Sequence, residues 1–135
     1  MNTGYLLMNV SKKLRYRLNQ QLVQLDLTAQ QWAVIQQLHQ MAHQAVSAQV
    51  LTERLDMDKP TISAIIKRLE LKDILYRKKN TVDSRVYDLF LTAKGQTIFE
   101  SARELSDVTL TEFLARLSET QQQELNQLLQ KLEEE

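Results

Sequence analysis

The sequence predicts a mainly helical chain of the α+β class, in which a single two-stranded hairpin lies between helices. Two glycines and one proline among 135 residues leave little turn-forming material, whereas the abundant leucine and glutamine favour helices. Leucines recur at helical spacing near both ends of the chain, and apolar and polar residues alternate in the segment after Ile74. A chain of 135 residues has room for one hydrophobic core, so we expect one domain.

Two helices are expected in the first third of the chain. Residues 4–25 carry leucines at helical spacing, which predicts a helix with an apolar stripe. Thr28 and Gln31 have the spacing of a capping box, so a second helix is expected to begin at Ala29. Its inward side chains are expected to be Trp32, Ile35, Leu38 and Ala42.

Two short helices joined by a tight turn follow. Ser47 is a suitable cap for a helix that ends at Leu55, and Asp58 for the next one, whose first turn accommodates Pro60. Because so few residues separate the two helices, they must cross steeply, as in a helix-turn-helix.

A hairpin is expected directly after this helix-turn-helix. Residues 75–79 and 85–91 have the alternation of strands, and the polar residues 80–84 form the tip between them. This order predicts a winged helix-turn-helix.

The chain is expected to end in two helices. Thr92 is a good cap for a long helix that ends near Arg116, and the capping-box pair Ser118 and Gln121 starts the last helix. That helix has one apolar stripe, formed by Leu125, Leu128, Leu129 and Leu132. The leucine stripes at both chain ends have little to pack against in one small chain, so we expect N- and C-terminal dimerisation helices and a homodimer.

Charge is distributed unevenly along a chain whose formal total is zero. Residues 1–51 and 52–95 each carry +3, and residues 96–135 carry −6. The absence of cysteine excludes disulfides, thiolate metal sites and sensing by thiol oxidation. No apolar run approaches the roughly 18 residues of a membrane span, and no signal-peptide pattern is visible, so we expect a cytoplasmic protein without a membrane partner.

The helix after Asp58 has a polar face suited to DNA. Its isoleucines and Leu69 fall on one side, which leaves Ser63, Ala64, Lys67 and Arg68 on the opposite side, with Lys59 and Thr61 at the margins. Short side chains near its start would let the backbone approach bases in a major groove, and the long cations would reach phosphates. The alternative is an ordinary solvated helix face.

The hairpin extends this positive charge. Arg77, Lys78 and Lys79 precede the tip, and Arg85 follows it, where its guanidinium could enter an adjacent minor groove. Asp83 lies two residues from Arg85, and we expect it to orient that arginine by charge-assisted hydrogen bonds. The alternative is an exposed ion pair without a role in binding.

The combined motifs resemble the MarR family of bacterial transcriptional regulators. They are 51–55 (LTERL), 58–63 (DKPTIS), 67–70 (KRLE), 74–77 (ILYR), 83–85 (DSR) and 89–95 (LFLTAKG). The resemblance implies a homodimer that reads a pseudo-palindrome, with a winged core over 28–92 and dimerisation helices over 1–27 and 93–135. It also implies recognition-helix contacts from Lys59, Thr61, Ser63 and Lys67, and a wing contact from Arg85. Where the family usually has glycine this chain has Asp73, which tolerates a left-handed cap.

A small-molecule effector pocket is implied by the family resemblance. Candidate residues are Met8, Tyr16, Trp32 and His39, which combine bulk with a polar tip in most cases. The alternative for Trp32 and Met8 is a place in the core. His39 and His43 have the i, i+4 spacing of a zinc pair, but no third ligand is indicated, so we expect no metal.

The sequence therefore predicts a sequence-specific double-stranded DNA-binding regulator, acting as a repressor that a ligand releases. No nucleophile–base pair or glycine-rich phosphate loop stands out, so we expect no enzyme and no cofactor. The alternative is a winged-helix protein-interaction module without specific DNA binding.

Overall fold

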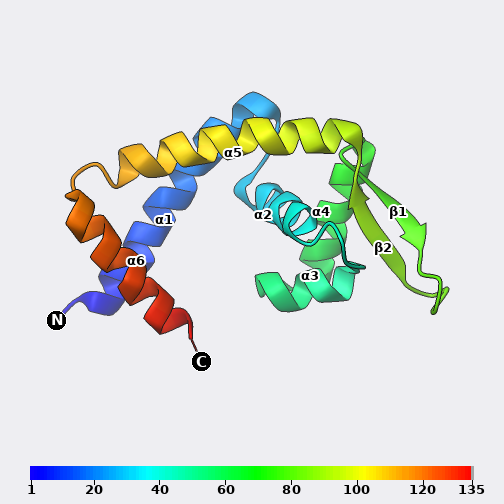
Figure 1. Cartoon of the computed structure of the whole chain (residues 1–135), viewed down its shortest axis with the longest axis horizontal. Helices are drawn as coiled ribbons and strands as arrows, with labels where there is room; N and C mark the ends of the chain where they lie inside the picture. Colours follow the sequence, from blue (N-terminus) through cyan, green and yellow to red (C-terminus); the bar gives the residue numbers. More distant parts are fainter. Residues whose placement is uncertain (135) are drawn as a thin grey trace.

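The computed structural model describes residues 1–134 and places two groups of elements near the two ends of one long helix (Figure 1). One group contains α2 (Ala29–Gln40), α3 (Ala48–Leu55), α4 (Lys59–Leu71) and a hairpin of β1 (Leu75–Lys79) and β2 (Tyr87–Leu91). The other contains α1 (Thr3–Leu22) and α6 (Glu119–Glu133), and α5 (Ala93–Phe113) spans both groups. The predicted mainly helical winged helix-turn-helix is confirmed.

Polar caps start the helices where the sequence predicts them. Thr28, Ser47, Asp58, Thr92 and Ser118 each accept a hydrogen bond from the backbone amide three residues ahead. Both predicted capping boxes are present. At Asp58 the hydrogen bonds from Thr61 lower the pKa of the carboxyl group.

Several predicted boundaries were wrong by a few residues. The α2 helix ends at Gln40, so Ala42 lies exposed in the following turn and not inside. The second strand begins at Tyr87 and not at Arg85, because the residues of the tip form a turn of their own. In that turn the Asn80 side chain accepts hydrogen bonds from the backbone amides of Val82 and Asp83.

The last two helices are separated slightly earlier than predicted. The α5 helix ends at Phe113 and not near Arg116, and Leu114 is its C-terminal cap. The chain then turns before Ser118 starts α6.

The core lies between α2, α4, the hairpin and the first half of α5. The predicted inner face of α4 is buried there: Ile62, Ile65, Ile66 and Leu69. The amide of Leu89 in β2 donates to the carbonyl of Val46 at 2.8 Å, so the loop before α3 is attached to the hairpin. This bond, together with the burial of Leu75 and Leu89 in the shared core, connects the helix-turn-helix to the wing.

The start of α5 is closely packed on the turn between α4 and β1. That turn passes through Asp73 in the left-handed conformation, at φ 60°, as the sequence predicts. The Thr92 hydroxyl donates to the Asp73 carbonyl at 2.6 Å, and the Thr92 amide donates to the Ile74 carbonyl at 3.0 Å. A β-carbon on Gly95 would lie 2.0 Å from that Ile74 oxygen, so only glycine fits without a shift.

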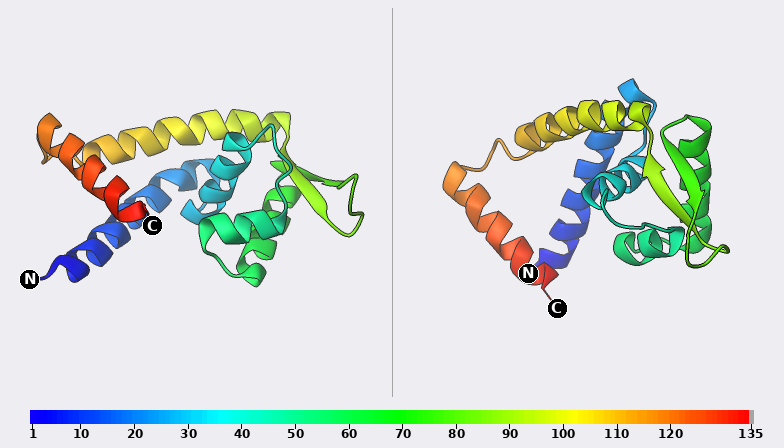
Figure 2. Two further views of the ribbon diagram at one scale, coloured as in Figure 1. Left: turned by 60° about the horizontal axis from the view of Figure 1, so that its bottom comes forward. Right: turned by 45° about the vertical axis from the view of Figure 1, so that its right-hand side comes forward.

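The far ends of the chain leave apolar surface open. No residue of α6 within the described chain is buried, and Leu128 and Leu132 are 61% and 69% exposed. Figure 2 shows α6 standing apart from the winged group in both views. Within residues 1–134 there is no helix with the length and apolar character needed to span a membrane.

Candidate nucleic-acid interface

The outward face of α4 is polar and accessible. Because its apolar side chains are buried, Ser63, Ala64, Lys67 and Arg68 are exposed on the opposite side. Lys59 is exposed at the start of the helix, and Thr61 is half-buried at its margin. The structure therefore places all six predicted α4 residues on or beside one accessible face.

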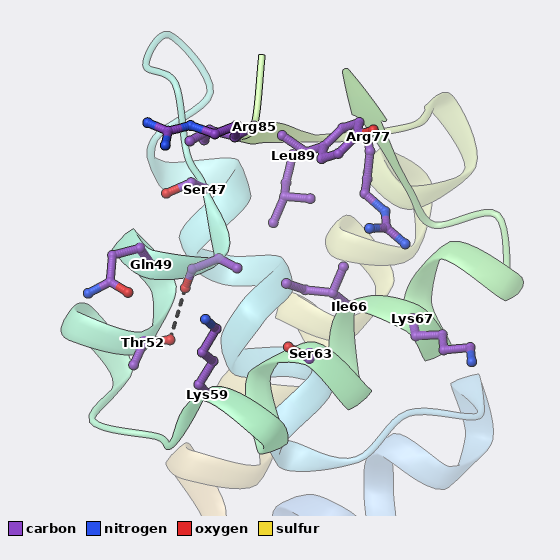
Figure 3. A pocket seen from close by; sticks show the side chains of 13 residues that line it. Ser47, Gln49, Thr52, Lys59, Ser63, Ile66, Lys67, Arg77, Arg85 and Leu89 are labelled. Carbon is purple, nitrogen blue, oxygen red and sulfur yellow. Dashed lines mark hydrogen bonds between the residues drawn. The ribbon is translucent and has the colours of Figure 1, made fainter. Parts of the chain in front are cut away.

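A groove of about 480 Å³ lies between this face, α3 and the hairpin (Figure 3). Four cations line it and no carboxylate does: Lys59 and Lys67 come from α4, and Arg77 and Arg85 from the hairpin. In Figure 3 the two arginines lie at opposite sides of the groove, with Leu89 between them. Four cations in one lining favour a polyanion such as a nucleic-acid backbone, and the carboxylates that pair with the two arginines lie outside the lining.

Asp83 orients Arg85 as the sequence predicts. Arg85 donates from Nε and Nη2 to the two carboxylate oxygens of Asp83, each at 3.1 Å, and its amide donates to Asp83 at 3.0 Å. These hydrogen bonds lower the pKa of the Asp83 carboxyl. The Arg85 side chain is still 89% exposed, so it can reach a ligand at the tip of the wing.

Arg77 is held by a residue that the sequence analysis missed. Its Nε donates to Glu70 Oε2 at 3.1 Å and its Nη2 to Glu70 Oε1 at 2.9 Å. The hydrogen bonds from Arg77 lower the pKa of the Glu70 carboxyl, and the same bonds raise the pKa of Arg77. The guanidinium also lies over the ring of Tyr87, with the carbon 5.8 Å from the ring centre.

The three consecutive basic residues of β1 do not form one patch. In the register of the two strands Arg77 lies opposite Leu89, and Lys79 lies opposite Tyr87; Leu89, Tyr87 and Arg77 line the groove, so this is the face of the hairpin turned toward it. Lys78 lies opposite Asp88 and points to the other face, because side chains alternate along a strand.

The groove also includes residues of α3 and its cap that sequence reasoning did not select. Ser47, Gln49 and Thr52 line it beside Lys59 (Figure 3). Their signal in the sequence was weak, because small polar residues on a short helix are common on any surface.

The four candidate effector residues do not converge on one site in the single chain. Met8 and Tyr16 on α1 are 76% and 64% exposed, whereas Trp32 is buried against Phe99 at 5.4 Å between ring centres. His39 stacks on the same Phe99 at 3.7 Å and lines a separate cavity of about 170 Å³. The core alternative is thus what the structure shows for Trp32, and not for Met8.

The histidine pair does not share a helical face. Because α2 ends at Gln40, His43 lies in the turn beyond it, whereas His39 remains on the helix with its Nδ1 3.1 Å from Gln96 Nε2. Within the described part of the chain, no three histidine or acidic side chains come together as metal ligands would.

Known proteins are similar to this chain in both sequence and fold. The sequence model of the MarR family matches residues 25–86. The chain is 30% identical over 118 residues to the HTH-type transcriptional regulator MgrA of Staphylococcus aureus, an alignment that covers 87% of this chain and 78% of MgrA.

Two solved structures superpose over nearly the whole chain. A mutant of MarR from E. coli complexed with operator DNA is 26% identical, with a TM-score of 0.86 and coverage of 98% of this chain and 94% of that one. The Mycobacterium tuberculosis MarR-family protein Rv2887 in complex with p-aminosalicylic acid is 25% identical, with a TM-score of 0.79 and 96% coverage of both chains. Together with the 30% identity to MgrA, these matches establish that the chain belongs to the MarR family of transcriptional regulators.

Proposed function

We propose that the protein is a homodimeric repressor that binds one pseudo-palindromic operator in double-stranded DNA and is released by a small ligand. The observation that carries the proposal is the groove in which the polar face of α4 and the arginine of the wing tip lie together. The DNA complex of the E. coli MarR mutant supports the same partner for this chain.

In this proposal α4 enters a major groove. Ser63 and Ala64 have short side chains that allow close approach to base edges, with Thr61 beside them. Lys59, Lys67 and Arg68 would neutralise phosphates on either side. The remaining basic residues of the hairpin, Lys78 and Lys79, add positive potential along the wing.

Arg85 would act in the neighbouring minor groove. Its bidentate contact with Asp83 restricts the guanidinium to a few orientations before DNA binds, which reduces the entropy lost on binding. A preorganised arginine favours the narrow minor groove of A·T-rich DNA, where the negative potential is strongest.

The dimer would form through residues 1–27 and 93–135, with the winged core over 28–92. An apolar cavity of about 470 Å³ lies between α1, the end of α5 and α6, and Leu6, Leu7, Val10, Leu110 and Leu129 are among its exposed lining residues. A second copy that inserts its own terminal helices would remove this surface from water. The two recognition helices of the dimer would then have to be about 34–36 Å apart to meet successive major grooves.

Release would follow from a change in that spacing. A ligand that binds more tightly to a dimer with wrongly spaced recognition helices lowers the affinity of the protein for the operator. The largest possible reduction equals the ratio of the ligand's affinities for the wrongly spaced and the correctly spaced dimer. The complex of Rv2887 with p-aminosalicylic acid supports a small organic acid as the class of effector to test first.

The test is a titration of labelled duplexes at several salt concentrations. Genomic fragments retained by the purified protein supply the candidate operator, and a shuffled duplex supplies the comparison. We expect the logarithm of the association constant to fall steeply with the logarithm of salt, and one palindromic site to bind far more tightly than the shuffled one. A protein-interaction module would instead bind all duplexes weakly and alike, and that result would reject the proposal.

Arg85→Ala gives the residue-level test of the wing. We expect operator binding to weaken by roughly 1–3 kcal/mol, with the melting temperature unchanged, because the side chain is exposed. Arg116→Ala, a matched loss of one exposed arginine beyond the end of α5, serves as the control. Equal operator affinity of Arg85→Ala and wild type would show that the wing does not read the DNA.

A further inference from the structure

The two arginines of the groove are each held by a carboxylate, but in different ways. Asp83 lies two residues from Arg85 on the same tip, so that ion pair moves as one unit. Glu70 belongs to the last turn of α4 and Arg77 to β1, so their ion pair connects the recognition helix to the wing.

The geometry of the second pair adds a directional contact between α4 and the hairpin. Both Nε and Nη2 of Arg77 engage the two oxygens of Glu70, and a fork of this kind restricts the plane of the guanidinium as well as its distance. The ring of Tyr87 in β2 packs against the same guanidinium. Glu70 therefore contacts the hairpin at a point where both of its strands contribute.

The same contact occupies the donors with which Arg77 would bind a phosphate. An arginine binds phosphate and carboxylate with the same fork of N–H groups, so Glu70 competes directly with a DNA backbone for this side chain. The Arg77 and Glu70 side chains are 43% and 37% exposed, which leaves the guanidinium within reach of a polyanion if the carboxylate is removed.

The lysines of the groove are in a different state. Across residues 1–134 no salt bridge involves Lys59 or Lys67, so their charges are available to phosphates. The groove thus combines two lysines without a salt bridge, an ion-paired Arg85 that is still 89% exposed, and an ion-paired Arg77 that is 43% exposed.

We propose that Glu70 is a specificity-determining positioning residue that withholds Arg77 from the DNA backbone and orients the wing on α4. Phosphate contacts carry no sequence information, so release of Arg77 alone would strengthen binding to every duplex by about the same factor. The preference for the operator falls because the wing, no longer held to α4 by Glu70, is placed less well for reading the neighbouring groove. This inference rests on the proposed DNA-binding function.

The experiment compares Glu70→Gln with wild type on the operator and on a shuffled duplex, between about 50 and about 200 mM salt. Glutamine retains the size of the side chain but loses the negative charge and one of the two acceptor oxygens, so the two-bond contact with the arginine is lost. We expect the salt slope, the change in the logarithm of the association constant with the logarithm of salt, to steepen by about 0.9 on the shuffled duplex, which is the contribution of one phosphate. Over that fourfold range of salt, the loss of affinity then becomes about 3.5-fold larger than in wild type. We expect the preference for the operator over the shuffled duplex to fall at every salt concentration.

Two further variants separate this role from a merely structural one. Glu70→Gln combined with Arg77→Gln removes the freed cation and keeps the net charge of the chain, so we expect the wild-type salt slope. Glu100→Gln removes a carboxylate from the Glu100–Arg103 pair on α5, outside the groove, and we expect no change in slope or preference. Far-UV circular dichroism confirms that each variant is folded at the temperature of the titration.

The possible outcomes distinguish the two proposals. An unchanged slope and preference in Glu70→Gln overturns the role of Glu70 while wild-type operator binding stands. A double variant with a shallower slope than wild type also overturns it, because Arg77 would then contact phosphate in the presence of Glu70. Wild-type protein without salt-dependent, sequence-preferring binding overturns the proposed function and this inference together.

Discussion

Replacing Gly95 by alanine perturbs the junction where α5 packs on the turn that leads into the wing. The new β-carbon would lie 2.0 Å from the carbonyl oxygen of Ile74, whereas such carbon–oxygen contacts are normally about 3.3 Å or longer. The start of α5 and this turn must therefore separate by more than about 1 Å. That movement strains or breaks the hydrogen bonds that Thr92 donates to Asp73 and Ile74.

The expected magnitude is a balance of three contributions. Forced overpacking costs about 1–3 kcal/mol, and the loss of one neutral hydrogen bond costs about 1 kcal/mol. The higher helix propensity of alanine returns up to about 1 kcal/mol. We expect a net loss of about 1–3 kcal/mol in the free energy of unfolding.

Chemical denaturation at a fixed protein concentration, followed by far-UV circular dichroism, measures this loss. Gly4→Ala is the matched control, because Gly4 also lies in the first turn of a helix and its β-carbon would meet no atom within 4 Å. We expect that variant to be as stable as wild type or slightly more stable. Gly95→Ala with wild-type or higher stability would refute the close approach of α5 to the turn.

Two other predictions concern the dimer and acid stability. Leu128→Asp should shift the protein from dimer to monomer in light scattering, because it places a charge in the apolar contact proposed between the two copies. Gln127→Asp, on the opposite face of α6, should leave the mass unchanged. A dimeric mass for Leu128→Asp would contradict the placement of α6 in the dimer contact. Hydrogen bonds lower the pKa values of Asp58, Glu70 and Asp83 below their usual 3.8 to 4.5, so their stabilisation is complete above that range and is lost as the pH falls through the lowered values. We therefore expect the melting temperature to fall on acidification below about pH 4.5, and to fall less steeply in Glu70→Gln. An acid dependence of the variant identical to that of wild type would contradict the stabilising role of the ionised Glu70.

Much of the local structure could be predicted because it depends on interactions between neighbours in the sequence. Caps such as Thr28 and Asp58 bond to amides three residues ahead, and Asp83 bonds to Arg85 two residues ahead, so each contact is encoded in a few adjacent residues. The alternation that predicted the hairpin and the buried face of α4 is likewise a local pattern. The endpoints were less certain: α2 stops at Gln40, and β2 starts at Tyr87, because the turns beyond them satisfy their own amides.

By itself the sequence determined the order of the helices, the hairpin between them and the cationic side of α4. Only the tertiary structure decided which cations are available for a ligand, because that depends on partners brought together across a turn. Glu70 engages Arg77, and the α4 lysines are left without such a partner in residues 1–134. It also decided that Trp32 belongs to the core, where Phe99 meets it from a helix distant in the sequence, and that Gly95 must be glycine, because a carbonyl from another segment occupies the place of a side chain. Contacts between segments far apart in the chain follow from packing, and no periodicity or local motif records them.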